Sequence, residues 1–217
     1  MIDFHTHTLF SDGDLLPSEL IQRAKIKGYK AIGITDHVDE SNIEDVVLKI
    51  TKFSREINKL NEIYVIPGVE ITHVTIIFIS NLVKKARKLG AKLVIVHGET
   101  IAEPVAKGTN MEALKSDIDI LAHPGLISID EVKLAKEKDI YLELTTRRGH
   151  SYTNGHVLKL SKKIGAKIVI NNDAHLPEDL LPEEFIKKIA LGSGMDNNDF
   201  QKALINASNL LKKIKNI

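Results

Sequence analysis

Histidines that share one kind of position are the residues of this chain best suited to chemistry. Six of the nine histidines lie at or just after the end of a short apolar segment typical of a β-strand: His5, His7, His37, His97, His123 and His175. Three carboxylates have comparable positions: Asp12, Glu70 and Asp173. Nitrogen and oxygen ligands of these types suit Zn, Mn or Fe. The pattern predicts one site that holds several metal ions.

Two pairs of these residues have the spacing of side chains that share one face of a strand. His5 and His7 are two positions apart, as are Asp173 and His175, and residues i and i+2 of a strand point to the same side. Asp3 shares that face with His5, and we expect it to orient an imidazole rather than to bind metal. One such pair is weak support for metal binding, because a histidine at a strand end is more often a hydrogen-bonded surface residue. The agreement of nine positions favours a metal centre.

Strands that alternate with helices are expected to bring these residues together. Seven segments rich in Ile and Val are predicted strands: 2–5, 30–35, 63–66, 92–96, 118–122, 140–144 and 166–170. Helical patterns cover 17–27, 43–60, 80–89, 128–138, 155–164, 182–190 and 196–214. Strands joined through single helices pair in parallel with right-handed crossovers. This number of units favours a closed α/β barrel, in which functional groups lie at the C-terminal ends of the strands.

The composition is that of one globular domain with little attraction for nucleic acid. The 217 residues have room for a single α/β domain over 1–217, and their hydrophobic content of 43% is ordinary for a globular protein. A formal net charge of +1 provides no overall positive field, which disfavours nucleic acid as a partner but leaves open a local basic patch. The absence of cysteine excludes disulfides, thiolate nucleophiles and Cys-based zinc sites.

The apolar segments predict a protein outside the membrane. They are all shorter than the roughly 18–20 residues that a membrane-spanning helix needs, so no membrane span is expected. The first residues, MIDFHTHT, lack the basic and apolar regions of a signal peptide. We therefore expect a cytoplasmic enzyme. The sequence leaves its oligomeric state open.

The histidine and carboxylate motifs resemble those of the polymerase and histidinol phosphatase (PHP) superfamily of metal-dependent phosphoesterases. The matching blocks follow the order seen in that family: His5-Thr6-His7 with Ser11-Asp12-Gly13, Thr35-Asp36-His37, Gly68-Val69-Glu70, Val96-His97-Gly98-Glu99, Ala122-His123-Pro124 and Asp173-Ala174-His175. They run through most of the chain. The resemblance implies a distorted (β/α)7 TIM-like barrel, in agreement with the seven predicted strands.

The resemblance also implies how two or three divalent ions share the nine ligands. The first ion would be bound by His5, His7, Glu70 and Asp173. The second would share Glu70 and would also be bound by His97 and His123. The third would be bound by Asp12, His37 and His175. Some relatives carry His at the position of Asp12, so the occupancy of the third site and the identity of the metals stay open.

The activity implied by the resemblance is hydrolysis of a small phosphate monoester, and histidinol phosphate is a candidate substrate. Coordination lowers the pKa of water and provides a hydroxide nucleophile at neutral pH. No catalytic residue beyond the metal ligands is then required. The chain is most similar to the branch of histidinol-phosphate phosphatases.

Three other functions stay open. A nuclease or nucleotide phosphodiesterase of the same superfamily would need a basic track lined by aromatic residues, and the chain has no Trp. An amidohydrolase-like metal hydrolase also begins with a His-x-His motif, but it ends in a lone Asp rather than in Asp173-x-His175. A non-catalytic, RNA-binding barrel would be expected to have lost metal ligands and gained basic charge.

Four residues are candidates for contact with a substrate phosphate: Arg147, Arg148, His150 and Lys107. The two arginines follow the sixth predicted strand, where a guanidinium could bind phosphate through two parallel hydrogen bonds, and the sequence does not choose between them. His150 precedes a predicted helix, whose first backbone N–H groups could bind an anion. Lys107 lies in a long predicted loop over 98–110. The roles of His73, His150 and His156 stay open.

Overall fold

The computed structural model describes residues 1–216 as a barrel of parallel strands. Within this range the strands form one sheet in the order β1-β2-β4-β5-β6-β7-β8, and β3 pairs with β4 alone. The strands are β1 (Ile2–Asp3), β2 (Ala31–Ile34), β3 (His37–Val38), β4 (Tyr64–Ile71), β5 (Leu93–His97), β6 (Ile120–Ala122), β7 (Tyr141–Thr145) and β8 (Ile168–Asn171). The predicted α/β barrel and its parallel pairing are confirmed.

The two edge strands of the sheet, β1 and β8, meet just beyond their C-terminal ends. A parallel bridge joins Thr6 to Ala174, and the N–H of His7 donates to the carbonyl of Ala174 at 2.8 Å. Closer to the strands, the N–H of Phe4 donates to the side-chain oxygen of Asn171 at 3.0 Å. A side chain here replaces part of a backbone ladder, so the barrel is nearly but not fully closed.

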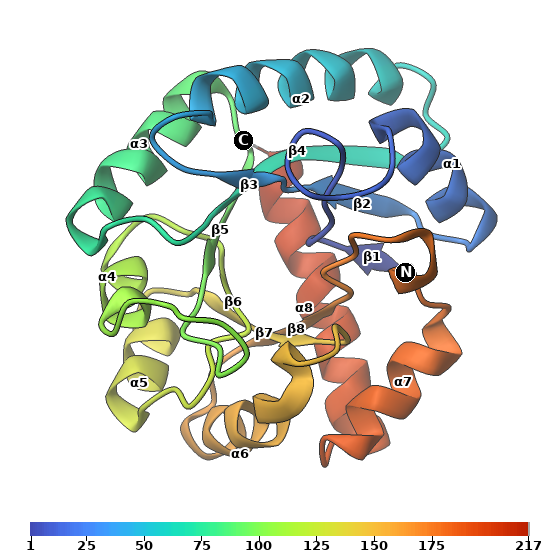
Figure 1. Ribbon diagram of the computed structural model, residues 1–217. Coiled ribbons are helices and arrows are strands. Elements are labelled where there is room, and N and C mark those ends of the chain that lie inside the picture. Colours follow the sequence, from blue (N-terminus) through green and yellow to red (C-terminus); the bar gives the residue numbers. More distant parts are fainter. Residues whose placement is uncertain (217) are drawn as a thin grey trace.

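Helices surround the strands on the outside of the barrel, except for the last one, which crosses behind them (Figure 1). They are α1 (Pro17–Ile26), α2 (Ile43–Asn58), α3 (Ile79–Leu89), α4 (Thr109–Lys115), α5 (Ile129–Glu137), α6 (Asn154–Ile164), α7 (Glu183–Gly192) and α8 (Asn197–Lys215). Short 3-10 turns lie in the connections: η1 (Ile76–Phe78), η2 (His150–Thr153) and η3 (Pro177–Asp179). Among residues 1–216, no helix combines the length and the apolar character that a membrane crossing requires.

Helix ends follow local sequence signals. Pro17 lies in the first turn of α1, where its missing N–H costs nothing. Ser128 and Glu131 form a reciprocal capping box at the start of α5. Gly90 ends α3 in the left-handed conformation with φ of 110°. These signals explain why the predicted helices begin and end close to the observed positions.

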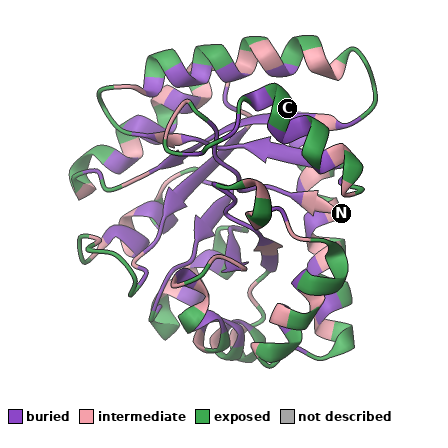
Figure 2. Ribbon diagram, turned by 45° about the vertical axis from the view of Figure 1, so that its right-hand side comes forward, coloured by how far each residue is buried: buried purple, intermediate pink, exposed green. Residues whose placement is uncertain are grey.

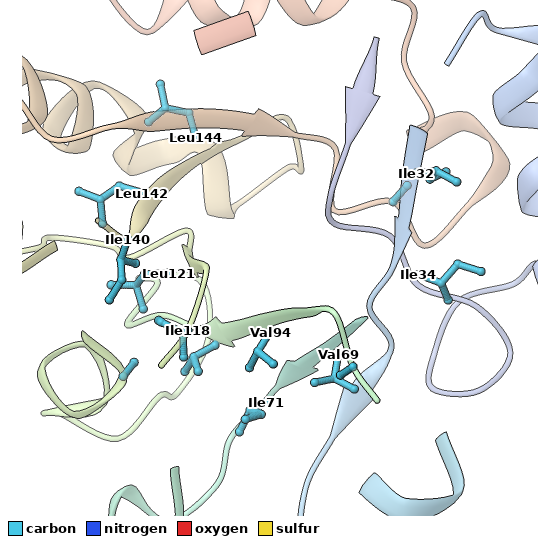
Figure 3. Packing of buried hydrophobic residues seen from close by; sticks show 14 of the residues in the cluster. Ile32, Ile34, Val69, Ile71, Val94, Ile118, Leu121, Ile140, Leu142 and Leu144 are labelled. Carbon is cyan, nitrogen blue, oxygen red and sulfur yellow. The ribbon is translucent and has the colours of Figure 1, made fainter. Parts of the chain in front are cut away.

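The outer face of the barrel is an apolar layer beneath the helices. Alternate residues of the strands point into it, among them Ile32 and Ile34 of β2 and Leu142 and Leu144 of β7 (Figure 3). The strands are buried on both faces, whereas the helices expose their outer sides (Figure 2). This is the pattern expected of a parallel sheet covered by helices.

Helix α8 packs against the inner face of the barrel at one end. Inward residues such as Phe4, Leu93 and Ile120 form one buried cluster with Leu210 and Ile214 of α8. Because Leu93 and Ile120 are the first residues of their strands, α8 packs against the N-terminal end of the barrel. In Figure 1 this helix, drawn in red, runs across the strands. The C-terminal end is left free for the site.

The strand predicted over 63–66 is longer in the structure. β4 continues through Pro67 and Gly68 to Ile71, although this dipeptide was expected to end it. Pro67 lacks an N–H, but its carbonyl still accepts from the N–H of Lys92 at 2.8 Å, so the pairing with β5 is maintained. Gly68 permits close packing, because a Cβ there would lie 2.9 Å from the carbonyl oxygen of Leu93. Glu70 therefore lies within a strand and not in a loop.

Two elements, β3 and α4, were not predicted. β3 is only His37–Val38, too short to show a pattern in the sequence. Its residue His37 pairs with Glu70 of β4, which brings two predicted ligands side by side. α4 begins at Thr109 after Gly108, which adopts φ of 100°. The predicted loop over 98–110 is therefore slightly shorter than expected.

Candidate metal centre

The nine predicted ligands lie together at the C-terminal end of the barrel. Six of them line a pocket of about 390 Å³: Asp12, His37, His97, His123, Asp173 and His175. His5, His7 and Glu70 are fully buried at its base, where they contact these residues. The positions predicted from separate strand ends therefore converge, as the barrel fold requires.

His5 and His7 show how the first strand places its ligands. The residue between them, Thr6, turns the other way and donates its hydroxyl to the carbonyl of Gly33. His5 donates its Nδ1 proton to the carboxylate of Glu143 at 2.8 Å. That bond directs the Nε2 atom of His5 into the site. An acceptor behind a ligand imidazole fixes the ring and its tautomer, as is usual for metal-binding histidines.

Four buried side chains form a group with the dimensions of a metal site. The Nε2 atom of His5 lies 3.3 Å from Glu70 Oε2 and 3.5 Å from Asp173 Oδ1. The Nε2 atom of His7 lies 3.7 Å and 3.2 Å from the same two oxygens. Tetrahedral ligands with bonds of about 2.0–2.2 Å are separated by roughly 3.3 Å. The four nitrogen–oxygen separations are close to this value, and the donor atoms of His5, His7 and Glu70 all lie within 4.8 Å of one another.

Several atoms of this group are left without ordinary partners. His5 Nε2, both ring nitrogens of His7 and Glu70 Oε1 are buried and have no hydrogen-bond partner within residues 1–216. An unpaired polar atom in a protein interior is costly, and bound metal ions would satisfy His5 Nε2, one ring nitrogen of His7 and Glu70 Oε1. The residues present therefore fit a metal ion.

Electrostatics keep the two central carboxylates ionised. Burial would raise the pKa of Glu70, but the charges of His5 and His37 outweigh it and hold that pKa well below its usual range. Burial likewise acts upward on the pKa of Asp173, and His5 and His7 together hold it well below its usual range. Two buried carboxylates that stay charged are suited to a multivalent cation.

A second group lies on the side of the loop that follows β1. His7, Asp12, His37 and His175 each place a donor atom within 4.8 Å of the others. Asp12 Oδ1 lies 3.2 Å from His175 Nε2 and 3.5 Å from His37 Nε2. The side chain of Asp12 is 56% exposed, whereas the histidines around it are at least partly buried. This group combines the three residues predicted to bind the third ion with His7, which was predicted to bind the first.

A third group consists of His97, His123 and His150, whose donor atoms also lie within 4.8 Å of one another. His97 donates its Nδ1 proton to the carbonyl of Gly98 at 3.1 Å, so Nε2 is the nitrogen available as a ligand. His123 Nε2 lies 3.5 Å from Glu70 Oε1, the carboxylate predicted to bridge two ions. His150, predicted to contact substrate, is here a neighbour of two predicted ligands.

The other predicted substrate residues separate into two sets. Arg147 lines the pocket, with its Nε atom 3.7 Å from Asp173 Oδ2. Arg148 and Lys107 are exposed and lie outside the set of pocket-lining residues. His73 lines the pocket, but His156 donates to the carbonyl of Ile127 at 2.7 Å and lies outside it.

Three residues of the site were not assigned to it from the sequence. Glu143 orients His5, and Asn171 donates to Glu143 at 2.7 Å. Both lie at or just after the C-terminal end of a predicted strand, so their positions in the sequence could have identified them as residues of the site. Glu103 contacts His97 at 3.2 Å. It comes from an irregular loop, and no periodic pattern marks it.

Comparison with known families agrees with this geometry. A model of the PHP domain matches residues 3–156, which is more than half of the chain. The chain belongs to the PHP domain family. Two predicted ligands of this PHP domain, Asp173 and His175, lie outside the matched range and join the site through the last strand.

Two similar proteins cover most of this chain. The PHP domain is 47% identical to an uncharacterized protein of Methanocaldococcus jannaschii over 215 residues, which covers 98% of this chain and 99% of that protein. It is 28% identical to a probable phosphatase of Shewanella pealeana over 203 residues, with coverage of 83% and 79%.

Two solved structures have a similar fold. Histidinol phosphate phosphatase from Lactococcus lactis, complexed with zinc, L-histidinol and phosphate, has a TM-score of 0.62 at 17% identity and covers 90% of this chain and 94% of that one. A chain in the structure of archaeal ribonuclease P with mature tRNA has a TM-score of 0.70 at 19% identity and covers 99% and 91%. At these identities the likeness concerns the fold.

Proposed function

We propose that this PHP domain is a metal-dependent hydrolase of small phosphate monoesters. The observation that carries the proposal is the buried group His5, His7, Glu70 and Asp173. Its donors have metal-site spacing and unpaired ring nitrogens, and it opens into a pocket that contains an arginine. The probable phosphatase among the relatives agrees with this activity.

The side chains of the site have two roles, metal binding and phosphate binding. Divalent ions, when bound, act as Lewis acids and lower the pKa of coordinated water. Glu70, with one oxygen near His5 and the other near His123, is placed to join two ions. Glu143 keeps the ring of His5 oriented. The site therefore needs no nucleophilic side chain, in agreement with the absence of cysteine.

Arg147 is the cation placed to bind the phosphate group. Asp173 and Asp179 lie 3.7 Å and 3.6 Å from its guanidinium nitrogens and hold the side chain at the pocket wall. A guanidinium donates two parallel hydrogen bonds to phosphate oxygens. Its position beside a metal ligand would align the phosphate with the metal centre.

The pocket volume of about 390 Å³ suits a small substrate. Histidinol phosphate is the first monoester to test, because the similar phosphatase from Lactococcus lactis holds zinc, L-histidinol and phosphate. The fold shared with a chain of ribonuclease P makes RNA the alternative ligand. The metal-site spacing of the donors favours the hydrolase over a barrel that only binds RNA.

The test combines metal analysis with phosphate release. Protein reconstituted with Zn, Mn or Fe is expected to retain at least two ions per chain, the number that Glu70 can bridge, and to release phosphate from monoesters that include histidinol phosphate. Single-stranded DNA and RNA are assayed in parallel. Fewer than two ions per chain together with no phosphate release would contradict the proposal. Cleavage of nucleic acid alone would favour the nuclease.

His97→Ala provides the residue-level test. Because His97 lies at a strand end with its Nε2 atom free for metal, we expect this variant to lose phosphate release and to keep the circular-dichroism spectrum of the native fold. His156→Ala is the matched control, since His156 donates to the carbonyl of Ile127 outside the pocket. Retained activity in His97→Ala would contradict the role of this residue.

A further inference from the structure

The loop between β5 and α4 is fastened at its base and exposed at its tip. Glu99 Oε1 accepts from the N–H groups of Gly108 and Asn110 at 2.8 and 3.0 Å. In turn, the side-chain oxygen of Asn110 accepts from the N–H of Glu99 at 2.9 Å. The side-chain amide nitrogen of Asn110 donates to the carbonyl of Pro124. Residues 101–104 at the tip are exposed. The base is therefore held by hydrogen bonds, whereas the tip is open to solvent.

The tip places Glu103 over the pocket. Its Oε2 atom lies 3.0 Å from His73 Nε2 and 3.2 Å from His97 Nε2, and its Oε1 atom lies 3.3 Å from His150 Nε2. The three histidines come from different parts of the barrel: His73 follows β4, His97 is the last residue of β5, and His150 begins η2. These separations resemble those of His5 and His7 from their carboxylates, and they match tetrahedral metal ligands, roughly 3.3 Å apart.

Glu103 is more exposed than two of the histidines that it contacts. The side chains of His97 and His150 are 3% and 5% exposed, whereas that of Glu103 is 39% exposed and stands on a loop tip. A catalytic metal keeps a position open for substrate. A carboxylate oxygen of Glu103 lies beside His97 Nε2, where it would compete with a phosphate oxygen for the open position of a metal ion. Both are anionic oxygen donors, so the two exclude each other.

We propose that Glu103 is an exchangeable ligand of the metal ion at His97, and that the phosphate of the substrate displaces it. The inference rests on the proposed metal-dependent function. It adds a ligand outside the nine predicted ones, and the role of the β5–α4 loop is to carry this ligand. With Glu103 bound, the ion is shielded; with phosphate bound, the tip of the loop is released.

Cobalt-substituted protein and inorganic phosphate test the exchange without measuring turnover. Glu103→Gln removes the charged ligand, and Asp39→Asn is the matched control, because Asp39 also lines the pocket but belongs to none of the candidate metal-binding groups among residues 1–216. We expect Glu103→Gln to retain cobalt and to change its visible spectrum. Saturating phosphate should bring the spectra of wild type and Glu103→Gln together, since phosphate then replaces the carboxylate.

Phosphate affinity provides the second readout. Glu103→Gln should bind phosphate about tenfold more tightly than wild type, which corresponds to about 1.4 kcal/mol of removed competition. Asp39→Asn should show only the smaller effect of removing a nearby charge. An unchanged spectrum in Glu103→Gln, equal affinity changes in both variants, or loss of cobalt from Glu103→Gln would each overturn the exchange. Failure of wild type to bind cobalt would instead contradict the metal centre itself.

Discussion

At the scale of residues, the site depends on which ring nitrogen each histidine leaves free. His5 commits Nδ1 to Glu143, which is itself held by Asn171. His97 commits Nδ1 to the carbonyl of Gly98. In both cases Nε2 is left to face the other donors. The tautomers are therefore set by neighbours outside the predicted ligands, as is common around protein-bound metals.

Two adjacent arginines allow a sharp test of phosphate binding. Arg147 lines the pocket near Asp173, whereas Arg148 is exposed outside it. Arg147→Lys keeps the charge but loses the planar fork, and hydrogen bonds to charged groups contribute about 1.5–3 kcal/mol. We expect kcat/KM for a phosphate monoester to fall by about tenfold or more. Arg148→Lys should leave it unchanged, and equal losses in both variants would refute the assignment.

At the scale of elements, close packing between loops determines where the ligands point. The turn after β6 contains His123 with φ of 24° and Gly125 with φ of 63°. A Cβ on Gly125 would lie 1.8 Å from the carbonyl oxygen of Glu99. The turn that carries His123 is therefore pressed against the base of the β5–α4 loop. A residue larger than glycine cannot occupy this position without displacing backbone.

Gly125→Ala tests this contact against a matched glycine. Gly28 also has positive φ, at 81°, but a Cβ there would meet no atom within 4 Å. Gly28→Ala should cost only the backbone strain of about 1–2 kcal/mol. Gly125→Ala adds a backbone clash, so we expect a larger loss of stability in thermal unfolding and weaker metal binding in a metal titration. Similar effects of both substitutions would contradict the packing argument.

Sequence patterns predicted some elements of the fold and missed others. Apolar runs that end in His or Asp predicted the strands, their parallel order and the convergence of nine positions, because the rim of a barrel follows directly from strand ends. The continuation of β4 through Pro67 was not predicted, since it depends on a hydrogen bond from Lys92, the residue before β5. Glu103 was missed for a similar reason. Its loop is shaped by contacts between Glu99 and Asn110, which leave no periodic trace.

At the scale of the whole molecule, the two ends of the barrel have different tasks. The N-terminal end is closed by α8, whose Leu210 is fully buried among inward-facing strand residues. The C-terminal end carries the polar residues of the candidate metal centre. The fold can therefore place charged and unpaired groups at one end because apolar burial at the other end and beneath the helices stabilises the chain.

Metal removal and a core substitution should separate these two tasks. Ions that bind only the folded state stabilise it by about 2.7 kcal/mol per site when their free concentration is about 100 times Kd. For a domain of this size, this raises Tm by roughly 5–11 °C. Leu210→Ala should lower stability by about 2–5 kcal/mol, but because Leu210 lies at the opposite end, it should show the same rise in Tm when metal is added. Calorimetry with metal or chelator measures both effects. Equal Tm values of wild type under the two conditions would contradict the metal centre.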